Sequence, residues 1–140
     1  MPKWWIDQNH YAMSFIPAAE REVANRSIDD PIRITLEFLL ANAVGRENAI
    51  PITTVIESLE LDIEYKDFQQ QILGASRHGD YFIGSGTSGI YLIETLEDIE
   101  AMQDFYLRKM RTQLQNFNNL ATIAERVGWQ LPTMEIVTTP

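Results

Sequence analysis

The residues with the most evident chemical potential are three glycines spaced as Gly84-x-Gly86-x-x-Gly89. This spacing occurs where a glycine-rich turn lets the N-terminus of a helix bind a dinucleotide pyrophosphate. Here the next residues, Ile90-Tyr91-Leu92-Ile93, predict a strand, so no helix would point its amides at a phosphate. A glycine-rich loop between strands also covers ATP in protein kinases, but that fold needs far more chain. We interpret the loop as a flexible hairpin tip.

Other reactive residue types are sparse. The chain has no cysteine, which excludes disulfides, thiolate zinc sites and cysteine nucleophiles. Its two histidines, His10 and His78, are not spaced with carboxylates in a zinc pattern, so we expect no metal and no cofactor. The acidic pairs Asp29-Asp30 and Glu97-Asp98 stand where helix capping explains them. No nucleophile and base pair is evident, and we expect a protein without enzymatic activity.

Composition describes an ordinary globular chain. With 140 residues, 45% of them hydrophobic and 22% charged, the chain is long enough for one compact domain with an extension. No apolar run is long enough to span a bilayer, and polar residues interrupt the N-terminal stretch, so we expect a cytoplasmic protein without membrane contact. The formal net charge of -9 repels nucleic acid overall.

Three helices are predicted in the first two thirds of the chain. Asp29-Asp30-Pro31 is typical of a helix start, and Gly45 of a stop, which predicts a first helix from Pro31 to Val44. Apolar spacing predicts a second, short helix within residues 49–61, with Ala49-Ile50 able to form a short edge strand before it, and a third helix from about Glu64 to His78.

A hairpin and a long helix follow. Residues 81–83 and 90–93 predict two strands joined by the glycine-rich tip at 84–89. Thr95 and Asp98 form a variant of the capping box that opens a helix running to about Val127. We therefore expect a mainly α fold with a small β-hairpin (α+β), in four parts: an aromatic N-terminal arm at 1–28, a domain at 29–94, a helix at 95–128 and a tail at 129–140.

The stretch Phe68-Gln-Gln-Gln-Ile72-Leu-Gly-Ala-Ser-Arg77-His-Gly79-Asp-Tyr-Phe-Ile83-Gly-Ser-Gly-Thr-Ser-Gly89-Ile-Tyr-Leu92 resembles the third helix and wing of winged helix-turn-helix DNA-binding domains of bacterial and phage regulators. In that pattern a helix ending in a basic residue and glycine precedes a strand, a Gly/Ser-rich tip and a second strand. Gly89-Ile90-Tyr91-Leu92 keeps the pattern of the second strand with Ile in place of an aromatic residue. The likeness covers roughly half the chain and specifies a fold more than an activity.

The resemblance implies a DNA-binding transcriptional regulator. Its third helix would enter the major groove, and its wing would touch the backbone or the minor groove. The residues implied for DNA contact on the third helix are Tyr65, Lys66, Gln69, Gln70, Arg77 and His78. Those on the wing are Ser85, Thr87 and Ser88.

The charge of this region departs from that pattern. Between Glu47 and Asp80, seven carboxylates stand against Lys66 and Arg77 only. Contacts to DNA phosphates depend on cationic side chains, so two cations predict a low affinity for the DNA backbone. The alternative is an acidic winged-helix module that docks on a basic protein partner without binding DNA.

The second half of the last helix carries apolar residues at alternating gaps of three and four. This heptad-like seam favours a homodimer through the C-terminal helix, although packing on the same chain is equally compatible with it. The residues expected at the dimer contact are Leu107, Met110, Leu114, Phe117 and Ala121.

Overall fold

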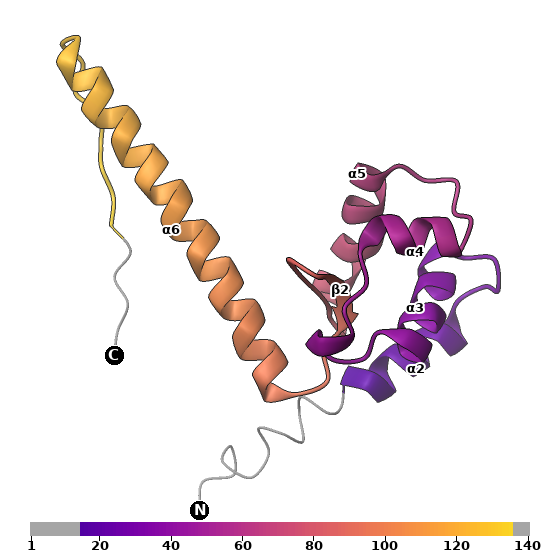
Figure 1. The fold of residues 1–140 in the computed structure, drawn as a ribbon. Coiled ribbons are helices and arrows are strands. Elements are labelled where there is room, and N and C mark those ends of the chain that lie inside the picture. The colour runs from indigo at the N-terminus through magenta and orange to yellow at the C-terminus, as the bar shows by residue number, and fades with distance from the viewer. Residues whose placement is uncertain (1–14, 136–140) are drawn as a thin grey trace, which may run out of the picture. The chain divides into compact units, whose positions relative to one another are not determined.

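The computed structural model describes residues 15–135, apart from the side chain of His78. The chain divides into two compact units, the first ending at Met102 and the second beginning at Gln103, and we describe each by itself (Figure 1). This division falls inside the long last helix, whereas the sequence placed a boundary at its start. Within the described range, no helix has the length and apolar character needed to cross a bilayer.

The first unit begins with a helix that the sequence analysis did not predict. Helix α2 runs from Phe15 to Asn25, inside the segment expected as an arm. Ile16, Ala19 and Val23 lie on one helical face and pack against the core, with Ala19 fully buried. This short stripe was obscured by aromatic residues before it; of these, Trp4, Trp5 and Tyr11 lie outside the described residues.

Helix α3 spans Pro31–Asn42 and begins as predicted. The backbone N–H of Ile32 donates to Oδ1 of Asp30 at 2.8 Å, which identifies Asp30 as the N-cap. The helix ends two residues before Val44 because the next backbone groups pair with a strand. Leu92 N–H donates to Ala43 O at 2.8 Å, and Gly45 N–H donates to Leu92 O at 2.9 Å.

The second and third predicted helices are shorter or less regular than expected. After a 3-10 turn, η1 (Arg46–Asn48), helix α4 covers only Ile52–Ser58. The third stretch is helical throughout but changes type, from α5 (Tyr65–Phe68) through the π-helical turn η2 (Gln69–Leu73) to the 3-10 turn η3 (Gly74–His78). The predicted helix at 64–78 is therefore present, although its hydrogen bonding is not uniform.

The predicted hairpin is confirmed, with its strands in a shifted position. Strands β1 (Ile83–Gly86) and β2 (Gly89–Leu92) pair antiparallel, with Ile83 opposite Leu92. Thr87 and Ser88 alone form the turn, so the expected six-residue flexible tip is wrong: Gly84 to Gly86 and Gly89 belong to the strands. The predicted edge strand before α4 reduces to one bridge, in which Ile50 pairs with Ile90 on the other side of β2.

Two glycines of the hairpin are required by its packing. Gly89 has a φ of 123°, and a Cβ there would lie 2.2 Å from the carbonyl carbon of Ile50. A Cβ on Gly84 would lie 2.6 Å from the ring of Tyr91, which covers this glycine from the paired strand. The close backbone pairing of β2 and the ring packing on β1 both depend on missing side chains.

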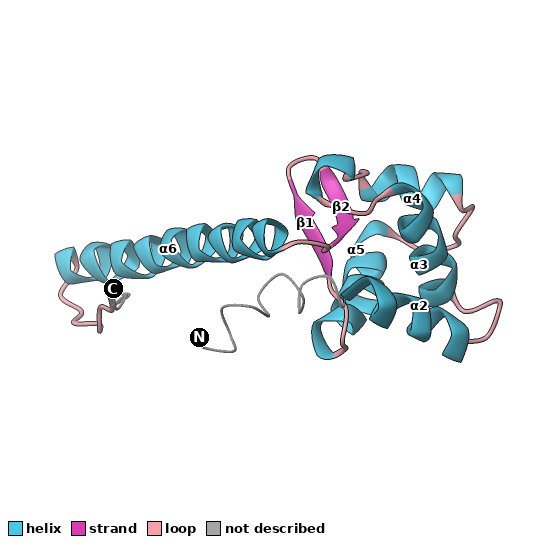
Figure 2. Cartoon of the chain, turned by 90° about the horizontal axis from the view of Figure 1, so that it is seen from below, coloured by secondary structure: helices cyan, strands magenta, loops and turns pink. Residues whose placement is uncertain are grey.

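The helices α2 to α5 and the hairpin enclose a single core in this unit (Figure 2). Its fully buried side chains come from four helical stretches and both strands, and include Ala19, Leu36, Leu39, Val55, Phe68, Ile72, Ile83 and Ile90. Because the core joins residues from 18 to 92, the hairpin is held to the helices by burial as well as by backbone pairing.

Helix α6 runs from Leu96 to Arg126, within one residue of the prediction at each end. The predicted capping box is confirmed: Asp98 N–H donates to Thr95 Oγ1 at 3.2 Å, and Asp98 Oδ2 accepts from Thr95 N–H at 3.3 Å. Its other oxygen accepts from Arg46 N–H at 3.2 Å, which ties the turn η1 to the start of α6. Asp98 is therefore a buried carboxylate with several donors.

The second unit consists of the remainder of α6 and the returning tail. Gly128, with a φ of 93°, ends the helix as predicted; its N–H donates to Glu125 O at 3.0 Å, and Trp129 N–H donates to Ala124 O at 3.0 Å. The tail then follows the helix back. The side-chain amide of Asn118 pairs with the backbone of Met134, donating at 2.7 Å and accepting at 2.9 Å.

Candidate nucleic-acid interface

Four of the residues expected to contact DNA form one exposed row on the third helical stretch. Tyr65 and Lys66 belong to α5, and Gln69 and Gln70 to the following π-helical turn. All four are exposed, whereas Phe68 and the residues one turn later point into the core. The row is thus the outward face of a helix whose inward face is fixed by burial.

This row combines groups that suit base edges. A glutamine amide can donate to and accept from one adenine at once, and a lysine can meet guanine or a phosphate. Gln71 is exposed as well, so three consecutive glutamines reach solvent where the helix widens. The sequence analysis did not single out Gln71, because a regular helix would have turned it away from Gln69.

Arg77 is held by the hairpin. Its Nη1 donates to Ile83 O at 2.6 Å and to Ser76 Oγ at 3.0 Å, and the guanidinium lies 4.0 Å from the centre of the Phe82 ring. The side chain is half-buried. We therefore assign Arg77 a positioning role at the junction of η3 and β1.

Ser76 completes this junction and was missed by the sequence analysis. Its buried hydroxyl donates to Leu73 O at 2.8 Å and accepts from Ile83 N–H at 3.2 Å. A serine at the end of a helix carries no signal of its own for such a role. The side chain of His78, also expected at the DNA contact, lies outside the described part of the chain.

The three wing residues do not occupy equivalent positions. Thr87 and Ser88 form the exposed turn of the hairpin, as a contacting tip requires. Ser85 instead lies in β1, where it is half-buried and its N–H points to Met102 Sδ at 3.5 Å. The tip of the hairpin therefore offers two hydroxyl side chains and no charge.

Two arginines of the first unit are paired with carboxylates. Arg26 Nε contacts Glu22 at 2.6 Å and its Nη1 contacts Asp30 at 2.9 Å. Arg33 Nε contacts Glu37 at 2.7 Å. On the row itself, Lys66 is the one cation, and it follows Glu64 and precedes Asp67.

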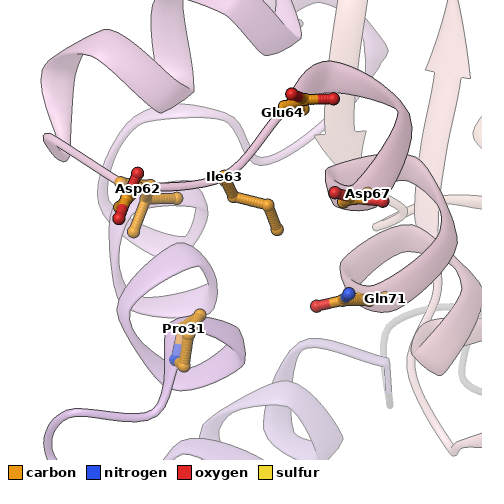
Figure 3. Close-up of a pocket in the computed structure, with 7 residues that line it drawn as sticks. Pro31, Asp62, Ile63, Glu64, Asp67 and Gln71 are labelled. Atoms are coloured by element: carbon orange, nitrogen blue, oxygen red, sulfur yellow. The ribbon is translucent and has the colours of Figure 1, made fainter.

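A cleft of about 480 Å³ opens beside the row (Figure 3). Ile63 projects toward it from the segment before α5, while Asp67 and Gln71 line the opposite side one helical turn apart. Its remaining lining residues are Pro31, Leu61, Asp62 and Glu64. The lining of the cleft therefore combines three apolar residues with three carboxylates and an amide.

Two tyrosines of the hairpin region are buried, Tyr81 just before β1 and Tyr91 in β2. Burial raises the pKa of Tyr81, and the negative charge of Glu22 adds to it. Burial likewise raises the pKa of Tyr91, with a contribution from Asp98. Both phenols stay protonated at neutral pH and act as core side chains.

The five residues expected at a dimer contact differ in their exposure to solvent. Met110 and Phe117 are exposed, Leu107 and Leu114 are half-buried, and Ala121 is buried. Ala121 lies one turn from Asn118, where the returning tail is attached. The seam predicted from the sequence is therefore only partly available to a partner.

Among residues 15–135, no cluster of histidine or acidic side chains is arranged to hold a metal ion. Comparison with known protein families, with curated proteins and with solved structures yields no match.

Proposed function

We propose that the chain is a winged helix-turn-helix protein that binds DNA and regulates transcription. The order of helix α3, a bridging residue at Ile50, helix α4, the helical stretch 65–78 and the hairpin matches the order of that fold. In this arrangement β2 pairs with β1 on one side and with Ile50, through a single bridge, on the other. The 65–78 stretch then acts as the recognition helix, and Thr87-Ser88 as the tip of the wing.

The exposed row on this helix is the observation that carries the proposal. Tyr65, Lys66, Gln69 and Gln70 present polar groups to solvent from a helix packed on its other face by Phe68. Each bidentate contact between a glutamine and an adenine discriminates by about 1–3 kcal/mol against other bases. The row is therefore suited to contacts with base edges more than to contacts with phosphates.

The charge pattern sets the expected salt dependence. With Lys66 as the single cation on the row, each protomer makes on the order of one or two phosphate contacts from this face, which gives a slope of log affinity against log salt of about -1 to -2 per protomer. We therefore expect a modest affinity for DNA, with base contacts contributing more of the binding free energy than phosphate contacts.

The test begins with selection of bound sequences from a random duplex pool at low salt, followed by fluorescence anisotropy on the selected site. Gln69→Ala and Gln70→Ala are expected to relax the base preference at one or two positions, by roughly tenfold each. Lys66→Ala is expected to weaken binding to all sequences alike and to reduce the salt slope by about one.

Matched controls are present in the second unit. Gln115→Ala removes an equally exposed glutamine, and Lys109→Ala a lysine that lies 4.5 Å from the ring of Phe105; both variants should bind as the parent does. If the parent enriches no sequence, or if Gln69→Ala and Gln115→Ala behave alike, the DNA-binding proposal is wrong.

The cleft beside α5 favours a second candidate, a module for a basic protein partner. Asp62, Glu64 and Asp67 line this cleft together with Pro31, Leu61 and Ile63, which suits a peptide that carries both a lysine or arginine and an apolar side chain. The double variant Asp67→Asn, Glu64→Gln should bind a lysine-rich peptide more weakly than the parent, as measured by fluorescence anisotropy. It should bind DNA as well as the parent or more tightly. Tight peptide binding without any DNA enrichment would replace the first candidate with this one.

A further inference from the structure

The tail that follows α6 is attached to the helix at two points, and its described part runs back beside the helix (Figure 1). At the first point Gly128, with a φ of 93°, reverses the chain, and Trp129 N–H donates to Ala124 O at 3.0 Å. At the second, the side-chain amide of Asn118 donates to Met134 O at 2.7 Å, and its oxygen accepts from Met134 N–H at 2.9 Å. One side chain thus binds both backbone groups of one tail residue, whatever side chain that residue carries.

The spacing of the two attachment points leaves the tail little slack. From Asn118 to Gly128, α6 and its closing turn advance by about 15 Å at the helical rise. The chain from Gly128 to Met134 spans at most about 20 Å when it is fully extended. Residues 129–133 must therefore lie extended along α6, antiparallel to the helix.

Burial on α6 follows the course of the tail. Between residues 108 and 126, every residue of the helix is exposed except Leu114, Asn118, Ala121 and Ala124. These four follow each other at gaps of four, three and three, so they share one face of the helix. Ala121, midway between the attachment points, is only 6% exposed. The small side chains of Ala121 and Ala124 leave room for an extended chain to lie close to the helix.

The tail, in contrast, buries little of itself. All residues from 129 to 135 are exposed, and Trp129, Leu131 and Met134 are 68%, 47% and 58% exposed. The tail is therefore held by few hydrogen bonds and little apolar contact. Segments of this kind open locally at a small fraction of the free energy that unfolds a core.

We propose that residues 129–135 form a reversible strap, which binds the face of α6 from Leu114 to Ala124 as an extended peptide ligand in cis. Pairing between Asn118 and Met134 closes the strap, and its loss opens this face to solvent. The face is thus a surface for an extended peptide, recognised through its backbone beside small apolar side chains. The proposal concerns the second unit alone and does not depend on whether the first unit binds DNA.

The chain has no cysteine, so one introduced thiol reports on the strap. Ala121→Cys places a thiol under the strap, and Thr122→Cys places one at the exposed neighbour. Full-length chains carrying either substitution are treated with iodoacetamide, and the rate of alkylation is followed by mass spectrometry. A thiol under the strap reacts only while the strap is open, so Ala121→Cys is expected to react about tenfold more slowly than Thr122→Cys.

The role of Asn118 is tested in the Ala121→Cys background. Asn118→Asp keeps the size of the side chain but replaces the donor to Met134 O with a second acceptor, so it is expected to raise the alkylation rate about tenfold. Asn119→Asp adds the same charge at the exposed neighbour and should leave the rate unchanged. Equal rates for Ala121→Cys and Thr122→Cys, or equal effects of Asn118→Asp and Asn119→Asp, would overturn the proposal.

A second measurement leaves position 121 unchanged, because a cysteine is larger than the alanine it replaces. Hydrogen exchange of the Met134 N–H is followed by NMR in the parent, in Asn118→Ala and in Asn119→Ala. Asn118→Ala removes both partners of Met134 and is expected to exchange this proton about tenfold faster than the other two chains. A Met134 N–H that exchanges in the parent at the rate of an unstructured peptide would overturn the strap. The DNA-binding test is unaffected by either result.

Discussion

The two units of this chain use apolar residues in opposite ways. In the first, large apolar side chains such as Leu36, Phe68 and Ile83 are fully buried, and among described residues only Ile28 and Tyr65 are large apolar side chains in the exposed class. In the second, Ala121 is the single buried apolar residue within 103–135, while nine large ones are exposed. The first unit is therefore stabilised by burial of its own core, whereas the second unit buries little apolar surface of its own.

Phenylalanine truncation in each unit tests this difference most strongly. Phe68→Ala removes a fully buried ring and should lower the free energy of unfolding by about 3–5 kcal/mol in urea titration. Phe117→Ala removes a ring that is 41% exposed in the single chain, and at concentrations where the chain is monomeric it should cost less than about 1 kcal/mol. Equal losses for the two variants at such concentrations would contradict the comparison.

Three glycines test how tightly each unit is packed. Gly89→Ala combines a positive φ with a collision against the backbone of Ile50, and should cost more than about 2 kcal/mol in thermal or urea unfolding. Gly128→Ala has a positive φ with open space around it, and should cost about 1 kcal/mol. Gly86→Ala meets neither obstacle and serves as the control. The comparison fails if Gly86→Ala and Gly89→Ala unfold alike.

The smallest expected effect concerns the cap of α3. Asp30→Ala removes the acceptor for Ile32 N–H and the partner of Arg26, and should cost about 1 kcal/mol at pH 7. Asp29→Ala, at an exposed neighbour, should have no measurable effect. Urea titration of the two variants side by side separates the effect of the cap from the general loss of one negative charge. An equal loss of unfolding free energy in both variants would show that the cap does not stabilise the helix.

The same carboxylate predicts a pH dependence. Desolvation acts to raise the pKa of Asp30, but the hydrogen bond from Ile32 and the Arg26 guanidinium outweigh it and hold the pKa below the ordinary 3.8. The stabilisation is therefore complete above about pH 4 and is lost as the pH falls through the lower folded value. The difference between the parent and Asp30→Ala should shrink in urea titrations below pH 4, and a constant difference down to pH 2 would contradict it.

Local signals in the sequence predicted much of the fold. Asp30, Thr95, Asp98 and Gly128 are residues whose types alone identify helix ends, and each lies at the predicted end in the structure. The helix α2 was missed because its stripe of Ile16, Ala19 and Val23 is short and includes a small residue. The first strand begins two residues later than predicted and the second one residue earlier, because glycines are typical of turns; here Gly84 makes room for Tyr91, and Gly89 for the backbone of Ile50.

The candidate site was predicted through the resemblance to winged-helix domains. That resemblance implied that Gln69 and Gln70 lie on the exposed side of the third helix, and both are exposed. Arg77 was assigned by its type, and its partners Ile83 and Phe82 are known only once the hairpin returns to the helix. Leu114 and Ala121 were expected at a partner contact but are half-buried and buried, and nothing in the sequence indicates that the tail is attached beside them at Asn118.

The ring of Tyr91 over Gly84 has a spectroscopic consequence. Protons on the glycine Cα that face an aromatic ring are shielded by its ring current, so the Gly84 Hα resonances should lie well upfield of those of other glycines. In an NMR spectrum these signals would report on the conformation of the hairpin. A change in them on addition of DNA or peptide would show that the wing moves, without any label attached to the chain.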